Sequence, residues 1–240
     1  MVIRSLRLLA APALVLAGLA LQQPAADAAF NISATSGGSA FGNATYSNFD
    51  NRTLGNTTQI TNNGALQVSF TGSGAFVQNS SQNQYQAPII SGFNNNFFET
   101  TTPPATPIAD TTTYISSGVG SATLTFLSGP QMYLGLLWGS VDTYNSLTFN
   151  LVGGGTQTFT GADIMTAAGS TNTTGTLYVN ITSTVAFTSV VASSTRTSFE
   201  LDNVAYSTSV VPEPSSMALC GIAGVIGMAV ARKRAKRVIA

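Results

Sequence analysis

Short stretches in which every second residue is apolar run through the middle of this chain. They are clearest in GALQVSF (residues 64–70), SATLTFL (121–127) and SLTFNLV (146–152). An alternation of period two places the apolar side chains on one face of a β-strand. TLYVNIT (176–182) repeats the pattern, and TVAFTSVV (184–191) is apolar on both faces. These stretches predict strands rather than helices.

The spacing of these stretches indicates the fold class. No segment between Phe30 and Val211 keeps the 3.6-residue spacing of an amphipathic helix, and the abundant Thr and Val are weak helix formers. Short strands separated by turn residues are typical of an antiparallel β-sandwich or jelly roll. We therefore expect one all-β domain over residues 29–209, which is long enough to enclose its own core.

Charge and composition exclude several classes of function. Residues 30–211 hold seven acidic and two basic residues, a net charge of −5. No basic patch is therefore present to bind phosphates, which argues against nucleic acid as a partner. The chain has no His and a single Cys, Cys220, so a Ser-His-Asp triad, a disulfide framework and a Cys-rich zinc site are excluded.

The N-terminus has the three parts of a secretory signal peptide. Arg4 and Arg7 precede an apolar stretch over residues 8–21, and small residues follow it. Ala26 and Ala28 form the small-x-small pattern at which such peptides are cleaved. Residues 1–28 are thus predicted to be a signal peptide, and the Sec translocation machinery is the expected partner in export.

The C-terminus has a second apolar run, Met217–Ala231, followed by five basic residues within residues 232–237. As a helix its 15 residues would span about 22 Å, which is short for a permanent transmembrane helix. The basic cluster would stay in the cytoplasm and leave the preceding domain outside. Pro212, Glu213 and Pro214 stay extended before the run, because proline disfavours helix.

The sequence VPEPSSMAL, the apolar run and the basic end resemble the C-terminal sorting signal of bacterial PEP-CTERM proteins. The resemblance assigns residues 210–240 to this signal, and it implies that the membrane peptidase exosortase is a partner. The tail would tether the chain transiently to the inner membrane, until cleavage near Pro212, Glu213 and Pro214 releases it to the cell surface or extracellular matrix. It also implies an association with exopolysaccharide and biofilm.

A second resemblance covers about half of the mature domain, from Ala109 to Tyr206. The stretches YLGLLWGSVDTYNSLTF and SFELDNVAY resemble one subgroup of exosortase-dependent surface proteins, and WGSVDTYN (138–145) is its most specific part. The resemblance implies a surface protein with no established catalytic residues.

The WGSVDTYN stretch supplies the candidate ligand residues Trp138, Asp142, Tyr144 and Asn145. Trp138 and Tyr144 have rings that could stack on a sugar. The alternative for Trp138 is a core position, since the preceding YLGLL is apolar on both faces. The alternative for Asp142 and Asn145 is a turn stabilised by their side chains. We favour the core and the turn.

The strand SFELDNVAY places Glu200 and Asp202 on one face, about 7 Å apart. Two carboxylates at this spacing could hold a structural Ca²⁺ if a loop supplied further oxygens. The favoured alternative is a solvated acidic face. No signal brings two carboxylates together across a cleft, as a glycosidase requires, so no catalytic residue is predicted.

The segment Asn79–Thr113 is rich in Asn and Pro and lacks a strand period. It predicts a long surface loop, with a binding loop as the alternative. The sequence as a whole predicts a non-enzymatic exported surface or matrix protein without a cofactor. The alternative function is a calcium-assisted carbohydrate-binding module with its site near Asp142 or Asp202.

Overall fold

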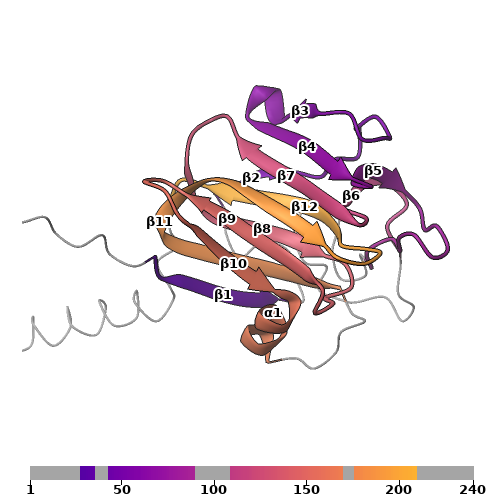
Figure 1. Ribbon diagram of the computed structural model, residues 1–240. Coiled ribbons are helices and arrows are strands. Elements are labelled where there is room, and N and C mark those ends of the chain that lie inside the picture. The colour runs from indigo at the N-terminus through magenta and orange to yellow at the C-terminus, as the bar shows by residue number, and fades with distance from the viewer. Residues whose placement is uncertain (1–27, 36–42, 90–108, 170–175, 210–240) are drawn as a thin grey trace, which may run out of the picture.

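The structure, a computed structural model, describes residues 28–35, 43–89, 109–169 and 176–209 (Figure 1). Nearly all of the predicted signal peptide, Ala26 included, lies outside these ranges, and so do the sorting segment 210–240 and residues 90–108 of the predicted loop. Among the described residues no helix is long and apolar enough to cross a membrane.

The described residues are mainly strands, which confirms the predicted all-β class. The strands are β1 (Phe30–Thr35), β2 (Thr45–Ser47), β3 (Gln59–Thr61), β4 (Leu66–Gly72), β5 (Ala75–Gln78), β6 (Thr113–Ser116), β7 (Gly120–Phe126), β8 (Gln131–Trp138), β9 (Asn145–Leu151), β10 (Thr156–Thr160), β11 (Leu177–Ser194) and β12 (Glu200–Ser207). A 3-10 helix, η1 (Asn62–Gly64), precedes β4, and an α-helix, α1 (Gly161–Ala168), follows β10.

All paired strands are antiparallel, and β11 joins two halves of one open sheet. Its first part pairs with β1 and β8, and its second part pairs with β7 and β9. One half continues from β8 through β12 and β6 to β5, and the other from β7 through β4 to β3. The sheet curls until the halves face each other, as in a sandwich (Figure 1). The Phe126 ring of β7 therefore lies 5.1 Å from the Tyr206 ring of β12.

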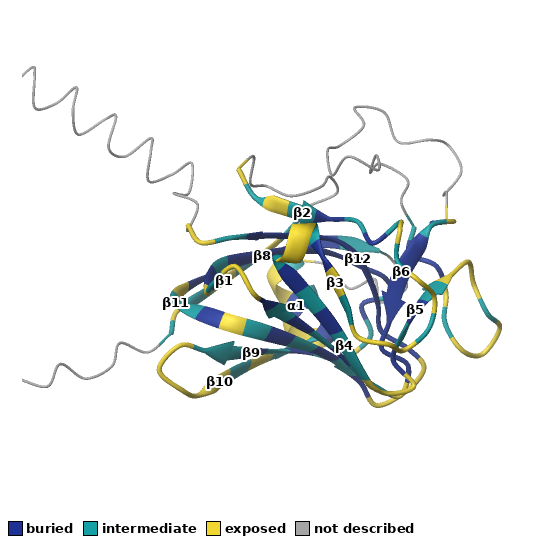
Figure 2. Cartoon of the chain, turned by 90° about the horizontal axis from the view of Figure 1, so that it is seen from above, coloured by how far each residue is buried: buried dark blue, intermediate teal, exposed yellow. Residues whose placement is uncertain are grey.

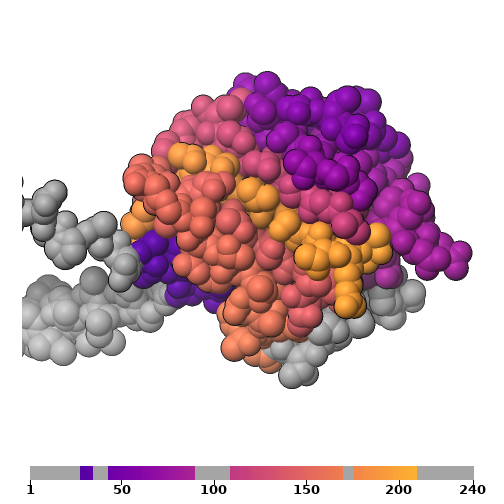
Figure 3. Space-filling model, in the orientation of Figure 1, coloured from indigo at the N-terminus to yellow at the C-terminus, as the bar shows by residue number. Residues whose placement is uncertain are grey.

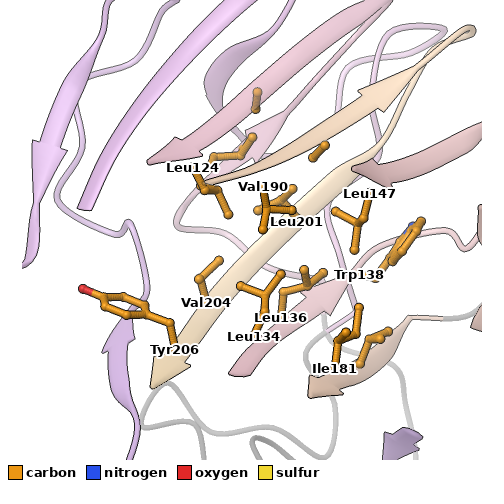
Figure 4. Packing of buried hydrophobic residues seen from close by; sticks show 14 of the residues in the cluster. Leu124, Leu134, Leu136, Trp138, Leu147, Ile181, Val190, Leu201, Val204 and Tyr206 are labelled. Atoms are coloured by element: carbon orange, nitrogen blue, oxygen red, sulfur yellow. The ribbon is translucent and has the colours of Figure 1, made fainter. Parts of the chain in front are cut away.

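A single apolar core fills the space between the two halves (Figure 4). The Trp138 ring of β8 is fully buried and stacks on Phe199, with 4.2 Å between ring centroids. The alternating residues found in the sequence supply the rest from both halves. Labelled examples in Figure 4 are Leu124, Leu134, Leu136, Leu147, Ile181, Val190, Leu201 and Val204, each without exposed surface.

Hydroxyl pairs take the place of charges on the outer faces of the sheet. Thr71 and Ser121 share a hydrogen bond of 2.8 Å between β4 and β7. Thr148 and Thr158 share one of 2.9 Å between β9 and β10. Cross-strand pairs of this kind stabilise antiparallel neighbours, which is how a chain with 8% charged residues covers the partly exposed surface in Figure 2.

Two expectations about local structure were wrong. The domain between Phe30 and Val211 was predicted without a helix, yet α1 forms because Thr160 and Asp163 make a reciprocal capping box and Gly169 ends the helix at a φ of 63°. The stretches 176–182 and 184–191 were predicted as separate strands. They are parts of one strand, β11, which continues through Ser183 without a turn and shifts its register with β9 between Phe187 and Ser189.

Candidate functional site

A polar cleft of about 620 Å³ lies where three connecting segments meet at one end of the sheet. Residues 80–86 follow β5, residues 140–144 join β8 to β9, and residues 197–200 lead into β12. In the space-filling view the magenta 80–86 segment projects from the body (Figure 3). The lining consists of hydroxyl, amide, carboxyl and phenol side chains, and none of its residues is aliphatic.

The 80–86 segment is held in shape by its own hydrogen bonds. The Ser81 amide donates to the Tyr85 carbonyl at 2.9 Å, and the Tyr85 amide donates to the Ser81 carbonyl at 3.1 Å. The Ala87 amide donates to Ser80 Oγ at 2.9 Å. The Tyr114 hydroxyl of β6 anchors the base by donating to the Asn79 carbonyl at 2.5 Å. This wall is therefore largely formed before any ligand arrives.

The 140–144 segment contains a turn, and of the two side chains expected to hold it only that of Asn145 bonds the backbone. The Asn145 amide donates to the Asp142 carbonyl at 3.0 Å. The Asn145 side-chain amide donates to the Ser140 carbonyl at 3.3 Å and to the Ser198 carbonyl at 3.1 Å. Asn145 is fully buried, so its ligand role is corrected to a positioning role that ties two walls of the cleft together.

Asp142 and Tyr144 both line the cleft, as their candidate ligand role requires. The Tyr144 hydroxyl donates to Asp142 Oδ2 at 2.8 Å. Partial burial, reinforced by this hydrogen bond, raises the pKa of Tyr144 to about 12. The guanidinium of Arg196 lies 5.6 Å from the centre of the Tyr144 ring, within the range of a cation–π contact. These two contacts thus hold the ring in place at the cleft wall.

Glu200 is a buried carboxylate in the cleft wall. Its Oε1 accepts from the Gln86 amide at 3.0 Å and from the Ser198 hydroxyl. Its Oε2 is buried and has no hydrogen-bond partner. Burial raises the pKa of Glu200 despite these bonds, and the nearby charge of Asp142 raises it further. Gly139 permits the close packing, because a Cβ there would lie 2.8 Å from Glu200 Cβ.

Trp138 and Asp202 do not line the cleft. Trp138 occupies the core position favoured for it from the sequence, since it has no exposed surface, and the ligand role considered as the alternative does not fit. The solvated acidic face expected at Glu200 and Asp202 is wrong, since each residue is only 2% exposed. Neighbouring strands and loops cover both faces of β12, so alternation along the strand does not separate core from solvent there.

The two carboxylates also have different neighbours. Besides burial, the negative charge of Asp142 raises the pKa of Glu200, whereas the charges of Asp110 and Asp50 raise the pKa of Asp202. In the described part of the chain, no three acidic, His or Cys side chains are arranged to hold a metal ion. A calcium site formed by Glu200 and Asp202 together is thus not what the structure presents.

The wall at residues 80–86 lies in the segment Asn79–Thr113, for which a binding loop was the alternative prediction, whereas Arg196 beside Tyr144 was not predicted. The Asn- and Gln-rich composition of SSQNQYQ is the signal that could have identified the wall, and it was noted only as a loop or binding loop. Nothing in the sequence indicates that this loop meets the WGSVDTYN turn, because the segments come together only through the pairing of β5 with β6 and of β6 with β12.

Comparison with known proteins identifies the C-terminal tail. Residues 210–234 match the family model of the PEP-CTERM protein-sorting motif. The predicted motif residues Pro212, Glu213 and Pro214 fall within this match. The motif implies that exosortase processes an exported protein at the membrane before it reaches the cell surface. No curated protein matches the chain. Membership of the WGSVDTYN subgroup stays a prediction.

Proposed function

We propose that this exosortase-sorted protein is a non-enzymatic component of the cell exterior whose cleft binds a neutral, hydroxyl-rich glycan of the surrounding exopolysaccharide or biofilm matrix. Export through the Sec machinery and a transient stay at the inner membrane would precede its release. The sorting motif supports the location, and the cleft supports the ligand class.

The composition of the cleft wall is the observation that carries the proposal. Gln82, Asn83 and Gln84 offer amides that both donate and accept, and Asp142 offers a carboxylate that accepts. Tyr85 and Tyr144 add aromatic rings beside them. Sugar hydroxyl groups match such alternating donors and acceptors. An anionic ligand fits poorly, because Asp142 and Glu200 both line the cleft.

The state of Glu200 supports binding rather than hydrolysis. A glycosidase needs two carboxyl groups that both reach the scissile bond. Glu200 Oε2 is buried within the wall, and Glu200 Oε1 already accepts two hydrogen bonds. Asp142 is then the accessible carboxylate of the cleft. We expect no release of reducing ends from any retained glycan.

The alternative function, a calcium-assisted carbohydrate-binding module, would place a calcium ion between Asp142 and Glu200 in this cleft. The hydrogen bonds of Glu200 argue against such an ion. An ion there would have to displace the Gln86 and Ser198 donors from Glu200. We therefore expect glycan retention to persist in chelator, at a temperature at which the protein is folded. Retention that requires calcium in the folded protein would favour the calcium-assisted module.

A glycan array that includes exopolysaccharide of the producing cells tests the proposal. Gln82→Ala and Asp142→Asn remove cleft groups without changing the core, and each should weaken retention of the glycans that the unmodified protein holds. Gln157→Ala on β10 is the matched control, since it removes the same amide outside the cleft. Equal retention by all four proteins, or no retention by the unmodified one, would contradict the proposal.

Processing is tested separately by the intact mass of the protein recovered from cells that contain exosortase. The proposal predicts a mass that lacks residues 1–28 and the apolar run Met217–Ala231. A mass that retains residues 217–240 would show that exosortase does not cleave the tail.

A further inference from the structure

The outer edge of β12 changes its partner strand at Asp202 and Asn203. Before this point Glu200 and Leu201 pair with β6, and after it Val204 to Tyr206 pair with β2. The pairing with β8 on the other edge is also irregular between Asp202 and Ala205. Because β2 ends opposite Val204 and β6 begins near Leu201, the segment that follows β2 and the segment that precedes β6 both lie at this break.

Each of the two arriving segments carries an acidic residue. Asp50 lies three residues after the end of β2, and Asp110 lies three residues before the start of β6. Asp110 and Asp202 are each 2% exposed. Asp110 Oδ1 accepts from the amide and the hydroxyl of Thr112, at 2.7 Å and 2.6 Å. Asp202 Oδ1, in contrast, is buried without any hydrogen-bond partner.

The charges at this break are not compensated by basic side chains. The basic residues of the described part are Arg52 and Arg196. Arg52 Nη1 donates to the Ile60 carbonyl, and Arg196 lies over the Tyr144 ring. Burial raises the pKa of Asp202 well above its ordinary value, and the charge of Asp110 and a side-chain hydrogen bond with Asp110 raise it further. Two buried carboxyl groups in contact are costly unless a proton or a cation neutralises the pair.

We propose that Asp202 and Asp110 hold a structural Ca²⁺ at the break between β2 and β6, with Asp50 at the rim of the site. Hard cations prefer carboxylate and other oxygen ligands, and Asp202 Oδ1 is an acceptor with nothing to accept. The described residues contain no ready set of three acidic ligands. Two carboxylates therefore carry the charge, and backbone carbonyls and water complete the shell.

The ion would tie together three segments that are far apart in the sequence, namely the exit of β2, the entry of β6 and β12. Neither Asp110 nor Asp202 lines the polar cleft. The inference is thus independent of the glycan-binding proposal, and either can fail alone. It also changes the partner of Asp202 predicted from the sequence, from Glu200 on the same strand to Asp110 on another segment.

Thermal unfolding of the full-length protein in chelator and in calcium is the first test. With calcium in about 100-fold excess over its dissociation constant, we expect the unfolding midpoint to rise by about 5 to 10 °C. Calorimetric titration with calcium alone should give one ion per chain. An identical midpoint in millimolar calcium and in chelator would overturn the inference, because Asp202 would then be neutralised by a proton.

Two variants locate the ion. Asp202→Asn should abolish the calcium-dependent rise and should be at least as stable as the unmodified protein in chelator, since it removes the uncompensated charge. Asp142→Asn is the matched control, which removes the same charge from the cleft and should keep the rise. If Asp202→Asn does not fold, Asp110→Asn takes its place. A calcium-dependent rise that survives in both Asp202→Asn and Asp110→Asn would overturn the site.

Discussion

The stretch WGSVDTYN connects two regions that use aromatic side chains in opposite ways. Trp138, at its start, is stacked on Phe199 inside the core, whereas Tyr144, near its end, lines the polar cleft. Only five residues lie between the two along the chain. The difference shows that a run of residues with one sequence signature can supply the core at one end and a site at the other, because the turn at Asp142 leads the chain out of the sheet.

The largest expected effect is on the core side of this comparison. Trp138→Ala should lower the free energy of unfolding by about 3 to 5 kcal/mol, through lost burial and the cavity that remains. The urea midpoint of the purified variant measures it, and Gln157→Ala on β10, a half-buried position outside the core cluster, serves as the control. A midpoint within error of the unmodified protein would show that the ring is not part of the core.

Gly161 lies at the contact between the two regions, because α1 begins against the backbone of Asp142. A Cβ at this position would lie 2.2 Å from the Asp142 carbonyl oxygen. Gly161→Ala should thus displace the cleft wall, costing about 1 to 3 kcal/mol of stability and weakening glycan retention as well. Ala162→Ser adds an atom at the next, exposed position and should change neither. An unaltered free energy of unfolding in Gly161→Ala would show that the backbone at Asp142 can shift to accommodate the added methyl group without cost.

On the cleft side the expected effects are smaller. Tyr144→Phe keeps the ring but removes the hydroxyl that donates to Asp142 Oδ2. We expect a change of about 0.5 to 1.5 kcal/mol, the usual net value of one hydrogen bond, in glycan affinity rather than in the urea midpoint. If Tyr144→Phe lowered the urea midpoint as much as Trp138→Ala does, the Tyr144 hydroxyl would stabilise the core, and the contrast between the two aromatic residues would be wrong.

The pH dependence of stability gives the subtlest contrast. Burial raises the pKa of Glu200 above its ordinary value of 4.5, so the folded state binds this proton more tightly than the unfolded state does. The contribution of Glu200 is therefore fully present below pH 4.5 and falls as the pH rises through its folded pKa. Glu200→Gln should flatten this fall, measured in chelator by urea unfolding between pH 4 and 8. An unchanged pH profile would place Glu200 in contact with solvent.

The sequence predicted the strands because their signal is local. Alternation in residues 64–70 and 121–127 requires one buried face, and β4 and β7 provide it. The same rule failed at Glu200 and Asp202, since β12 is covered on both sides and its pattern carries no information about exposure. The helix α1 was missed because its eight residues are too short for a period, although Thr160, Asp163 and Gly169 form its capping signals.

The site was predictable only in part, for a related reason. Asp142 and Tyr144 were candidates because both lie in the WGSVDTYN stretch, Tyr144 for a ring that could stack on a sugar and Asp142 as the less favoured alternative to a turn. Their partners come from residues 80–86 and from Glu200. These contacts depend on the order of strands in the curled sheet, and no single segment of the sequence specifies that order.

Hydrogen exchange of the protein with and without a retained glycan tests most directly whether the cleft is the functional region. We expect slower exchange of backbone amides in residues 80–86 and 140–144 when the glycan is bound, and unchanged exchange in β4 and β7. Protection confined to any other surface, with the 80–86 and 140–144 segments unaffected, would contradict it.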